Sequence, residues 1–389
     1  MRIGIITFWE SDDNYGQVLQ CWALQQYLKS LGHEPFLIRY KVLFEPSAPS
    51  KPLYVRIAKA LLLFPIFTRY YKRKKIINGI RLSQENEKLN VQRKFKDFRD
   101  HYIVQSEVEY IGLDSLQKNP PQADIYITGS DQVWGLLLDK KEHEAYFLNF
   151  GDKKMKRASY AASFSRKEYP IALQGKLQEM LKKFDYISVR EKEGVEIVRK
   201  LGFKAEHTID PTLLLNKSDY SNALGLKSFP SKGILIYSLN YSSKKDIPWK
   251  KIKNYATAKN EKITVITGSG YIPARKLFEG VDYCYATIPQ WIEMISSSSL
   301  IVTSSFHGIV FCIIFHKHFI YVPIKGEHSK GNSRIIELLD ELGLEGMIWE
   351  KKKFIETYAN SVINWLVVEK RLNQIKQKSL TFLDDIMKE

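Results

Sequence analysis

The chain has 389 residues, of which 44% are hydrophobic and 26% are charged. That composition is typical of a globular protein, and the length is too great for one ordinary core, so two domains are expected. The formal net charge of +16 predicts anionic partners, such as phosphorylated substrates, nucleic acid or an acidic membrane surface. Three cysteines without a CxxC spacing argue against a zinc site or a disulfide framework and favour a reducing cytoplasm. No apolar run reaches the length of a membrane span, and the amino terminus enters a strand pattern rather than a signal peptide.

The amino-terminal residues predict a strand, a helix and a second strand. Residues 2–8 form a continuous apolar run of strand length. A helix then runs from about Gly16 to Gly32, and residues 35–40 complete a βαβ unit. The loop after the first strand of such a unit lies at the carboxyl edge of the sheet, where ligands bind, although a simple Asn-Tyr-Gly turn explains it equally well. The candidate acceptor-binding residues of this loop are Asn14, Tyr15 and Gln17.

Residues 47–84 form a basic segment without an acidic residue. It contains nine lysines and arginines around a short apolar centre, which Pro65 interrupts. Basic ends around an apolar centre favour a segment that lies in a membrane interface, because anionic lipids attract each nearby Lys or Arg by about 1 kcal/mol. An ordinary pair of helices with solvated lysines is the alternative. We expect an insertion in the first domain, with an anionic membrane surface as its partner.

The next buried strand, residues 123–129, delivers a group of polar and aromatic residues to its carboxyl end: Ser130, Asp131, Gln132 and Trp134. Residues that follow a parallel strand usually face the crevice. Asp131 is then a candidate base or hydroxyl orienter, Trp134 is a candidate stacking surface, and Ser130 is a further acceptor contact. A turn with an Asx cap is the alternative for this stretch.

Two further strands, residues 157–164 and 186–190, extend the first sheet. The second ends in Arg190, whose guanidinium can hold a carboxylate or phosphate with two parallel hydrogen bonds. Equally, Arg190 can pair with Glu191 or Glu193. The stretch TIDPTLLL then leads out of the first domain, with its Asp-Pro interpreted as a turn.

A second alternating pattern of strands and helices follows. We therefore expect a first domain over residues 1–215, a second over residues 216–350, and carboxyl-terminal helices over residues 351–389 that can pack back on the first domain. Both domains are of the α/β class, with parallel sheets.

The central stretch of the second domain, residues 300–315, is LIVTSSFHGIVFCIIF, an apolar strand that leads through two serines and a His-Gly pair into an apolar helix. The free N–H groups and the dipole of a helix start favour a phosphate or a carboxylate there. The candidate donor-binding residues are Ser304, Ser305, His307 and Gly308. The alternative is that Ser305 is only an N-cap and His307 a hydrogen-bonded core histidine.

Several motifs, taken together and in this order, resemble those of the polysaccharide pyruvyl transferase family: NYGQVLQCWALQQYL, GSDQVW, SYAASFS, ISVREKEG, DPTLLL, SSFHG and SRIIELLDELGL. The resemblance implies two Rossmann-like domains that face a cleft, the α/β architecture of GT-B glycosyltransferases. It also implies transfer of the enolpyruvyl unit of phosphoenolpyruvate onto two hydroxyls of a sugar. The product would be a pyruvate ketal, made in the biosynthesis of a surface or capsular polysaccharide.

The resemblance further implies that His307 and Arg190 contact phosphoenolpyruvate. Many relatives carry a basic residue about two positions from the His-Gly step, whereas this chain has Phe306 immediately before His307. Arg334 is the candidate that replaces the missing phosphate contact. We expect His307 to act as the acid or to contact the leaving phosphate, with Asp131 as the base on the acceptor side and Arg190 as the third catalytic residue. No step of this chemistry requires a metal or another cofactor.

The expected acceptor is a galactose-type sugar on a polyprenyl diphosphate, which an enzyme at the cytoplasmic face of the inner membrane would meet. Nucleic acid is not expected as a partner, since the sequence has no RRM, KH or helix-turn-helix pattern. The chief alternative is a GT-B glycosyltransferase that uses a nucleotide sugar and shares the fold and the anion site. A non-catalytic glycan or nucleic-acid binder and a structural partner in a polysaccharide assembly complex are the remaining alternatives.

Overall fold

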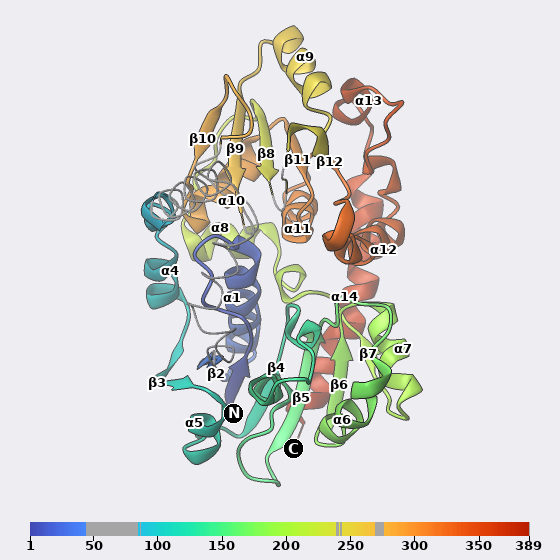
Figure 1. The fold of residues 1–389 in the computed structure, drawn as a ribbon. Coiled ribbons are helices and arrows are strands. Elements are labelled where there is room, and N and C mark those ends of the chain that lie inside the picture. The colour runs from blue at the N-terminus through green and yellow to red at the C-terminus, as the bar shows by residue number, and fades with distance from the viewer. Residues whose placement is uncertain (44–84, 86, 239–240, 242, 269–275, 389) are drawn as a thin grey trace, which may run out of the picture.

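The computed structural model describes residues 1–388 except for 44–84, 86, 239–240, 242 and 269–275 (Figure 1). The basic segment 47–84 therefore lies outside the described residues, and so does its expected membrane contact. The described chain forms two parallel sheets, one above the other in Figure 1, each packed against helices.

The first sheet has seven strands in the order β3-β2-β1-β4-β5-β6-β7, all parallel. Its strands are β1 (Arg2–Ile6), β2 (Glu34–Lys41), β3 (Gln105–Ile111), β4 (Ile125–Thr128), β5 (Lys156–Ala162), β6 (Tyr186–Val189) and β7 (Glu206–His207). Its helices are α1 (Tyr15–Ser30), α4 (Phe95–Tyr102), α5 (Leu113–Lys118), α6 (Ile171–Leu181) and α7 (Lys192–Lys200). In the central strand β1, Ile3 lies opposite Pro35 of β2 and Ile125 of β4. Residues 3–6 are all buried, which explains why this stretch contains only apolar residues and a glycine.

The second sheet has five parallel strands in the order β10-β9-β8-β11-β12. Its strands are β8 (Ile234–Ser238), β9 (Ile263–Thr267), β10 (Asp282–Cys284), β11 (Leu300–Thr303) and β12 (Phe319–Tyr321). The helices of this part of the chain are α8 (Lys217–Leu224), α9 (Trp249–Lys259), α10 (Ile288–Ser297), α11 (Phe306–Ile314), α12 (Ser333–Leu342) and α13 (Ile355–Ala359). These two sheets confirm the expected α/β class with two Rossmann-like units.

Aromatic side chains join the two sheets into one continuous core. Trp22 of α1 packs on Tyr220 of α8 with ring centroids 5.4 Å apart, and Tyr220 packs on Phe311 of α11 at 4.9 Å. Tyr15 of α1 stacks on Trp291 of α10 at 5.0 Å. The junction is therefore closely packed, and it holds the carboxyl edges of the two sheets toward each other (Figure 1).

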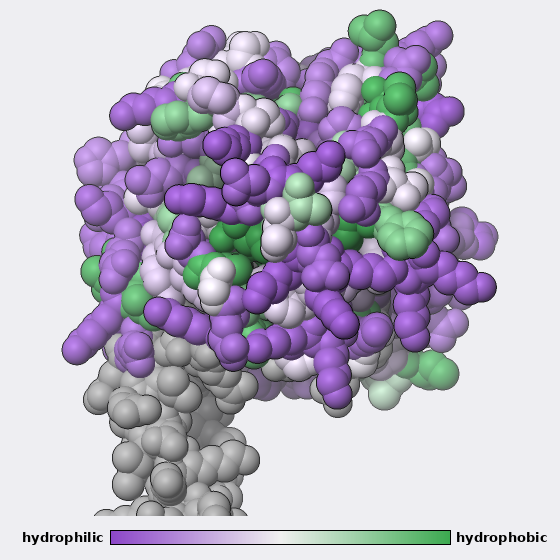
Figure 2. Space-filling model, turned by 90° about the horizontal axis from the view of Figure 1, so that it is seen from above, coloured by the Kyte–Doolittle hydropathy of each residue, from purple (hydrophilic) through white to green (hydrophobic). Residues whose placement is uncertain are grey.

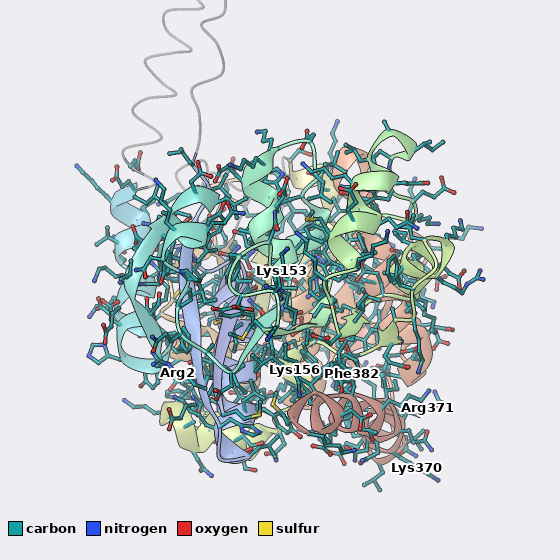
Figure 3. The ribbon with its side chains drawn as sticks, turned by 90° about the horizontal axis from the view of Figure 1, so that it is seen from below. Arg2, Lys153, Lys156, Lys370, Arg371 and Phe382 are labelled. Atoms are coloured by element: carbon teal, nitrogen blue, oxygen red, sulfur yellow. The ribbon has the colours of Figure 1, made fainter. Side chains whose placement is uncertain are left out.

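The last helix, α14 (Trp365–Met387), connects the second sheet with the first. Near its start, the Trp365 ring stacks on His316, which follows α11, with centroids 4.8 Å apart. Near its end, Ser379 Oγ accepts a hydrogen bond of 2.9 Å from the N–H of Ile209, and Phe382 lies on the side that faces the body of the protein (Figure 3). Lys156 Nζ then donates to the carbonyl oxygen of residue 388 at 2.6 Å. This helix therefore closes the second unit and packs on the first.

The surface at the second-sheet end of the molecule is largely hydrophilic, with hydrophobic side chains in small separate groups (Figure 2). Such a surface fits a chain with a net charge of +16. In the part of the chain that the structure describes, no helix combines the length and apolar character needed to cross a membrane.

Candidate active site at the junction of the two sheets

The first turns of α1 and α11 meet at the junction of the sheets. A Cβ atom added at Gly16, in the first turn of α1, would lie 1.9 Å from Nδ1 of His307, in the first turn of α11. The imidazole therefore packs directly on the α1 backbone, and only 8% of His307 is exposed. Only a residue without a side chain at position 16 allows this contact.

Asp210 is the buried centre of the site, and sequence reasoning did not assign it a functional role. Its Oδ2 accepts a hydrogen bond of 2.6 Å from Arg190 Nη1 and lies 3.5 Å from Nε2 of His307. Its Oδ1 accepts from the N–H and the hydroxyl of Thr212 at 3.0 and 2.7 Å. Burial alone would raise the pKa of Asp210, but His307, Arg190 and Thr212 outweigh it and hold the pKa well below the usual value. Asp210 is thus an ionised anchor between the Arg190 guanidinium and the His307 ring.

Two arginines stack on one aromatic ring. The guanidinium carbons of Arg190 and Arg334 lie 4.9 and 5.3 Å from the ring centroid of Phe306. Burial and, next, the neighbouring charge of Arg190 lower the pKa of Arg334 to about 10. Phe306 therefore holds two cations near each other, and an anion between them would relieve their repulsion.

Several N–H groups of this pair have no hydrogen-bond partner among the described residues, namely Nε and Nη2 of Arg190 and Nε of Arg334. The Oδ1 atom of Asp131 lies 3.8 Å from Arg190 Nη2, beyond hydrogen-bond distance. When the Gln132 amide is turned so that its oxygen faces Arg334, that oxygen lies 2.8 Å from both Nη1 and Nη2. Buried charged donors without partners are costly, so this arrangement suits a polyanionic ligand.

Arg190 pairs with Asp210 rather than with Glu191 or Glu193. The Glu191 carboxylate instead accepts hydrogen bonds from Ser163 Oγ at 2.7 Å and from the N–H of Ser165 at 2.8 Å. Glu191 is therefore bound by the segment that follows β5 rather than by Arg190.

The small residues before and within α11 have structural contacts of their own. Ser305 is the N-cap, and its Oγ accepts a hydrogen bond of 3.2 Å from the N–H of Gly308. A Cβ atom at Gly308 would lie 2.8 Å from Thr303 Oγ1, so this glycine lets α11 pack closely on β11. Ser304 is buried beside Tyr241. Each of these residues therefore shapes the helix start that carries His307.

The candidate acceptor residues do not form one group. Asn14 is the N-cap of α1 and accepts from the N–H of Gln17 at 3.3 Å, while the Gln17 side chain accepts from the N–H of Ser11 at 3.0 Å. Ser130 Oγ lies 3.3 Å from Oδ2 of Asp210, beside the arginines. Among these candidates, Ser130 and Asp131 are the ones at the anion site.

The structure corrects the assignment of Trp134 as a stacking surface. Its ring is completely buried, stacks on Phe147 at 5.2 Å, and donates from Nε1 to the carbonyl oxygen of Tyr146 at 3.0 Å. Trp134 is therefore a core residue, and it lies in the short 3-10 helix η1 (Val133–Gly135) that follows Asp131.

Tyr15 is also completely buried, and it joins the two units instead of facing a substrate. Its hydroxyl donates to the carbonyl oxygen of Ala286 at 2.7 Å and accepts from Arg93 Nη1 at 2.8 Å. Arg93, a second residue that sequence reasoning missed, also donates from Nη2 to Thr267 Oγ1 at 3.0 Å. This contact holds the start of α1, and with it Gly16, against the second sheet.

One group of potential metal ligands occurs among the described residues, and it contains His207, Glu337 and Glu341, with ligand atoms within 4.8 Å of one another. The ammonium of Lys192 lies 2.6 Å from Glu341 and 3.3 Å from Glu337. The group is therefore an ion-pair cluster between α7 and α12, and Lys192 supplies its positive charge.

Solved structures resemble the chain over nearly its whole length, at low identity. An α-glucosyltransferase in complex with UDP and a 13-mer DNA has a TM-score of 0.48 and 9% identity, covering 97% of this chain and 90% of the other. MnaA from S. aureus with UDP has a TM-score of 0.46 and 10% identity, covering 97% and 91%. CalG4, the calicheamicin glycosyltransferase, has a TM-score of 0.42 and 13% identity, covering 98% and 94%. These values carry no information about substrates, and the fold assignment rests on the strand order of the two sheets.

No curated protein matches the chain. Residues 14–326 match the protein family described as polysaccharide pyruvyl transferase. The matched range includes the motifs whose residues meet at the junction: Arg190 after β6, Asp210 before α8, and the Phe306-His307 step of α11. The chain therefore belongs to the polysaccharide pyruvyl transferase family.

Proposed function

We propose that this protein transfers the enolpyruvyl unit of phosphoenolpyruvate to a sugar and closes it into a pyruvate ketal across two hydroxyls, with release of phosphate. The observation that carries the proposal is the pair of buried guanidinium groups that lie on the ring of Phe306. Three of their N–H-bearing nitrogens, Nε and Nη2 of Arg190 and Nε of Arg334, have no partner among the described residues. Phosphoenolpyruvate carries a carboxylate and a phosphate, so it needs two such cationic subsites close together.

The donor side is assigned to Arg190, Arg334 and the start of α11. The two guanidiniums can each hold one anionic group of the donor in bidentate fashion. Gln132 orients Arg334, and Asp210 orients Arg190 through its bond of 2.6 Å. The α11 start adds partial positive charge beside His307.

The proposed reaction begins with protonation of the donor's methylene carbon, which becomes a methyl group and leaves an oxocarbenium-like centre at C2. One sugar hydroxyl adds to C2 and loses its proton. Phosphate then leaves from C2 with the C–O bond electrons and takes up a proton, and the neighbouring hydroxyl adds to the same carbon as it loses its own proton. The ketal and phosphate are the products, so no oxidant or reductant is consumed.

His307 is the proposed proton donor, and Asp131 is the proposed base for the acceptor hydroxyl. The ionised carboxylate of Asp210 lies 3.5 Å from His307 Nε2, so a negative charge stands next to the ring that would carry the proton. Asp131 lies on the other side of Arg190, at the edge of the first sheet, where an acceptor could approach. The proposed acid thus lies in the unit of the second sheet, and the proposed base lies in the unit of the first sheet.

The proposal is tested by measuring phosphate release from phosphoenolpyruvate with galactose-, glucose- and mannose-terminated lipid-linked acceptors. We expect release only when an acceptor is present, together with a product heavier by one pyruvate ketal. Failure with every acceptor, combined with thermal stabilisation by a nucleotide sugar, would instead identify a GT-B glycosyltransferase.

Replacing Arg334 by glutamine is expected to raise KM for phosphoenolpyruvate about tenfold and to change kcat much less. A charge-assisted hydrogen bond to an anion contributes about 1.5 to 3 kcal/mol, and this one would already form in the ground state. Arg199→Gln is the matched control, since Arg199 is an exposed residue that pairs with Glu196 on the surface of α7. An unchanged KM in the Arg334 variant would remove Arg334 from the donor site.

For the acceptor we propose a sugar carried on a polyprenyl diphosphate at an anionic membrane surface, with the basic segment 47–84 as the membrane contact. Replacing the four basic residues 72–75 by glutamate reverses their charge and is expected to abolish binding to vesicles that contain phosphatidylglycerol. A control with the same charge change replaces four exposed lysines elsewhere: Lys29, Lys118, Lys200 and Lys204. Equal loss in both variants would show a general charge effect, and unchanged binding in the first would refute the membrane contact.

A further inference from the structure

A cavity of about 620 Å³ lies between α8, α11 and α14. Ile313 and Ile314, at the last turn of α11, form part of its wall, whereas His307 stands in the first turn of the same helix. The cavity is thus at the opposite end of α11 from the proposed active site. Its volume is within the range of small-molecule sites in proteins, roughly 300 to 1,000 Å³.

The floor of this cavity is apolar. It is formed by side chains from the segment before α8, from α11 and from α14: Leu213, Leu215, Ile313, Ile314, Val368 and Leu372. Such a surface favours contact with a hydrocarbon chain over contact with water.

The rim of the cavity carries two ammonium groups, those of Lys376 and Lys217, that form no ion pair with a described residue. Lys376 is partly buried, and it forms no hydrogen bond or ion pair with any described residue; burial also lowers its pKa. Lys217 lies across the cavity on α8, with Nζ 6.0 Å from the ring centroid of Phe315. A cation that is half withdrawn from water and unpaired is stabilised by an anion that enters the same space.

The nearby carboxylates are already engaged elsewhere. Glu369 Oε1 lies 3.0 Å from Nε2 of His316. Asp219, the acidic group that acts on Lys376, accepts a hydrogen bond of 2.8 Å from the N–H of Asn216 in the cap of α8. The residues that line the cavity include two lysines, Lys217 and Lys376, and one carboxylate, Glu369, so the ammonium groups of the lining outnumber its carboxylates.

We propose that this cavity binds an amphiphile with one anionic end, either a carboxylate or a phosphate, and an apolar chain. The chain would lie on the leucine, isoleucine and valine floor, and the anionic end would pair with Lys376 and Lys217. The site is independent of phosphoenolpyruvate and of its reaction. Because its walls come from the segment between the two units and from α14, which reaches both of them, a bound ligand would hold these elements together.

The test compares four probes by isothermal titration below their micelle concentrations: decyl phosphate, decanoate, decanol and inorganic phosphate. We expect decyl phosphate or decanoate to bind at least tenfold more tightly than decanol and inorganic phosphate. The stronger of the two anionic probes identifies the headgroup chemistry. Decanol binding as tightly as both of them, or no binding of either, would overturn the proposal.

Two variants on α14 locate the binding. Lys376→Gln removes the unpaired ammonium without breaking a hydrogen bond to a described residue, and it is expected to weaken decyl phosphate binding at least tenfold. Lys370→Gln is the matched control on the same helix, because Lys370 lies on the outer side of α14 (Figure 3). Leu372→Trp fills the floor and should abolish binding while the charge stays the same. Equal weakening in the Lys370 and Lys376 variants would show non-specific attraction and refute the site.

Discussion

Replacing Asp210 by asparagine is expected to lower kcat for phosphate release by about 10²- to 10⁴-fold, the usual contribution of one acid–base group. Asparagine has nearly the shape of aspartate but no charge, so His307 would lose the carboxylate that lies 3.5 Å from its Nε2. The ring would then have no negative charge beside it at the position where we expect it to donate a proton. Steady-state kinetics measure the effect, and KM for phosphoenolpyruvate should change less than kcat, because the side-chain oxygen of asparagine can still accept the hydrogen bond from Arg190.

A double-variant cycle separates this positioning role from a purely structural one. If Asp210 acts through His307, the Asp210→Asn change will add little to the defect of a His307→Gln variant. If it only stabilises the fold, the loss will be the same in both backgrounds. Asp114→Asn is the control, because Asp114 pairs with Lys141 at 2.6 Å on the surface, and its loss should leave kcat unchanged.

Replacing Gly16 by alanine is expected to reduce kcat at least about 100-fold, although alanine is the better helix former. The new Cβ would lie 1.9 Å from Nδ1 of His307. A Cβ atom is fixed to the backbone and cannot rotate away from this clash, so the imidazole must move. A displacement of about 1 Å of a catalytic group can by itself cost about 100-fold in rate. Alanine at a helical position otherwise stabilises a helix by up to about 1 kcal/mol, so the fold should persist. Phosphate release and thermal unfolding of the same preparation measure both effects.

The matched control is Gly175→Ala in α6. A Cβ atom at Gly175 would have no heavy atom within 4 Å, so this variant should keep full activity and gain a little stability. If Gly16→Ala kept wild-type kcat, the contact between α1 and the His307 ring would have no part in catalysis.

The α/β class and most of the strands were predictable, because a parallel strand that is buried on both faces consists of a short run of apolar residues. The runs at residues 2–8 and 123–129 correspond to β1 and β4; β1 ends earlier than its run, and β4 is shorter than its run at both ends. At the carboxyl ends the chain leaves the sheet toward the junction, and an apolar run alone does not show where hydrogen bonding to the neighbouring strand stops. The order of the strands and the continuous core between the sheets depend on contacts between distant residues, which local patterns do not contain.

The arginines and the histidine of the candidate site could be named from the sequence. Arg190, Arg334 and His307 come from separate segments, and the structure brings them together around Phe306 and Asp210. Asp210 was missed because Asp-Pro is a common turn signal, and here the residue both caps the turn and binds Arg190. Its presence in the DPTLLL motif was the signal that could have identified it.

The aromatic predictions were wrong for a different reason. Trp134 and Tyr15 both follow strands near the carboxyl edge, and the sequence does not show on which side of the backbone a side chain will lie after a loop. Trp134 enters the core of the first sheet, and Tyr15 enters the junction between the sheets. In both cases the large ring is buried, because the free energy of removing an aromatic side chain from water favours burial over exposure.

The return of α14 to the first sheet has a consequence for how the protein is made. Ribosomal synthesis delivers β1 through β7 long before residues 379–388, yet those late residues bond to Ile209 and Lys156 and cover Tyr186. The unit that is synthesised first is therefore completed last, after the second sheet has emerged. Until then its uncovered side is available to chaperones, and the two units should acquire their final stability in one concerted step.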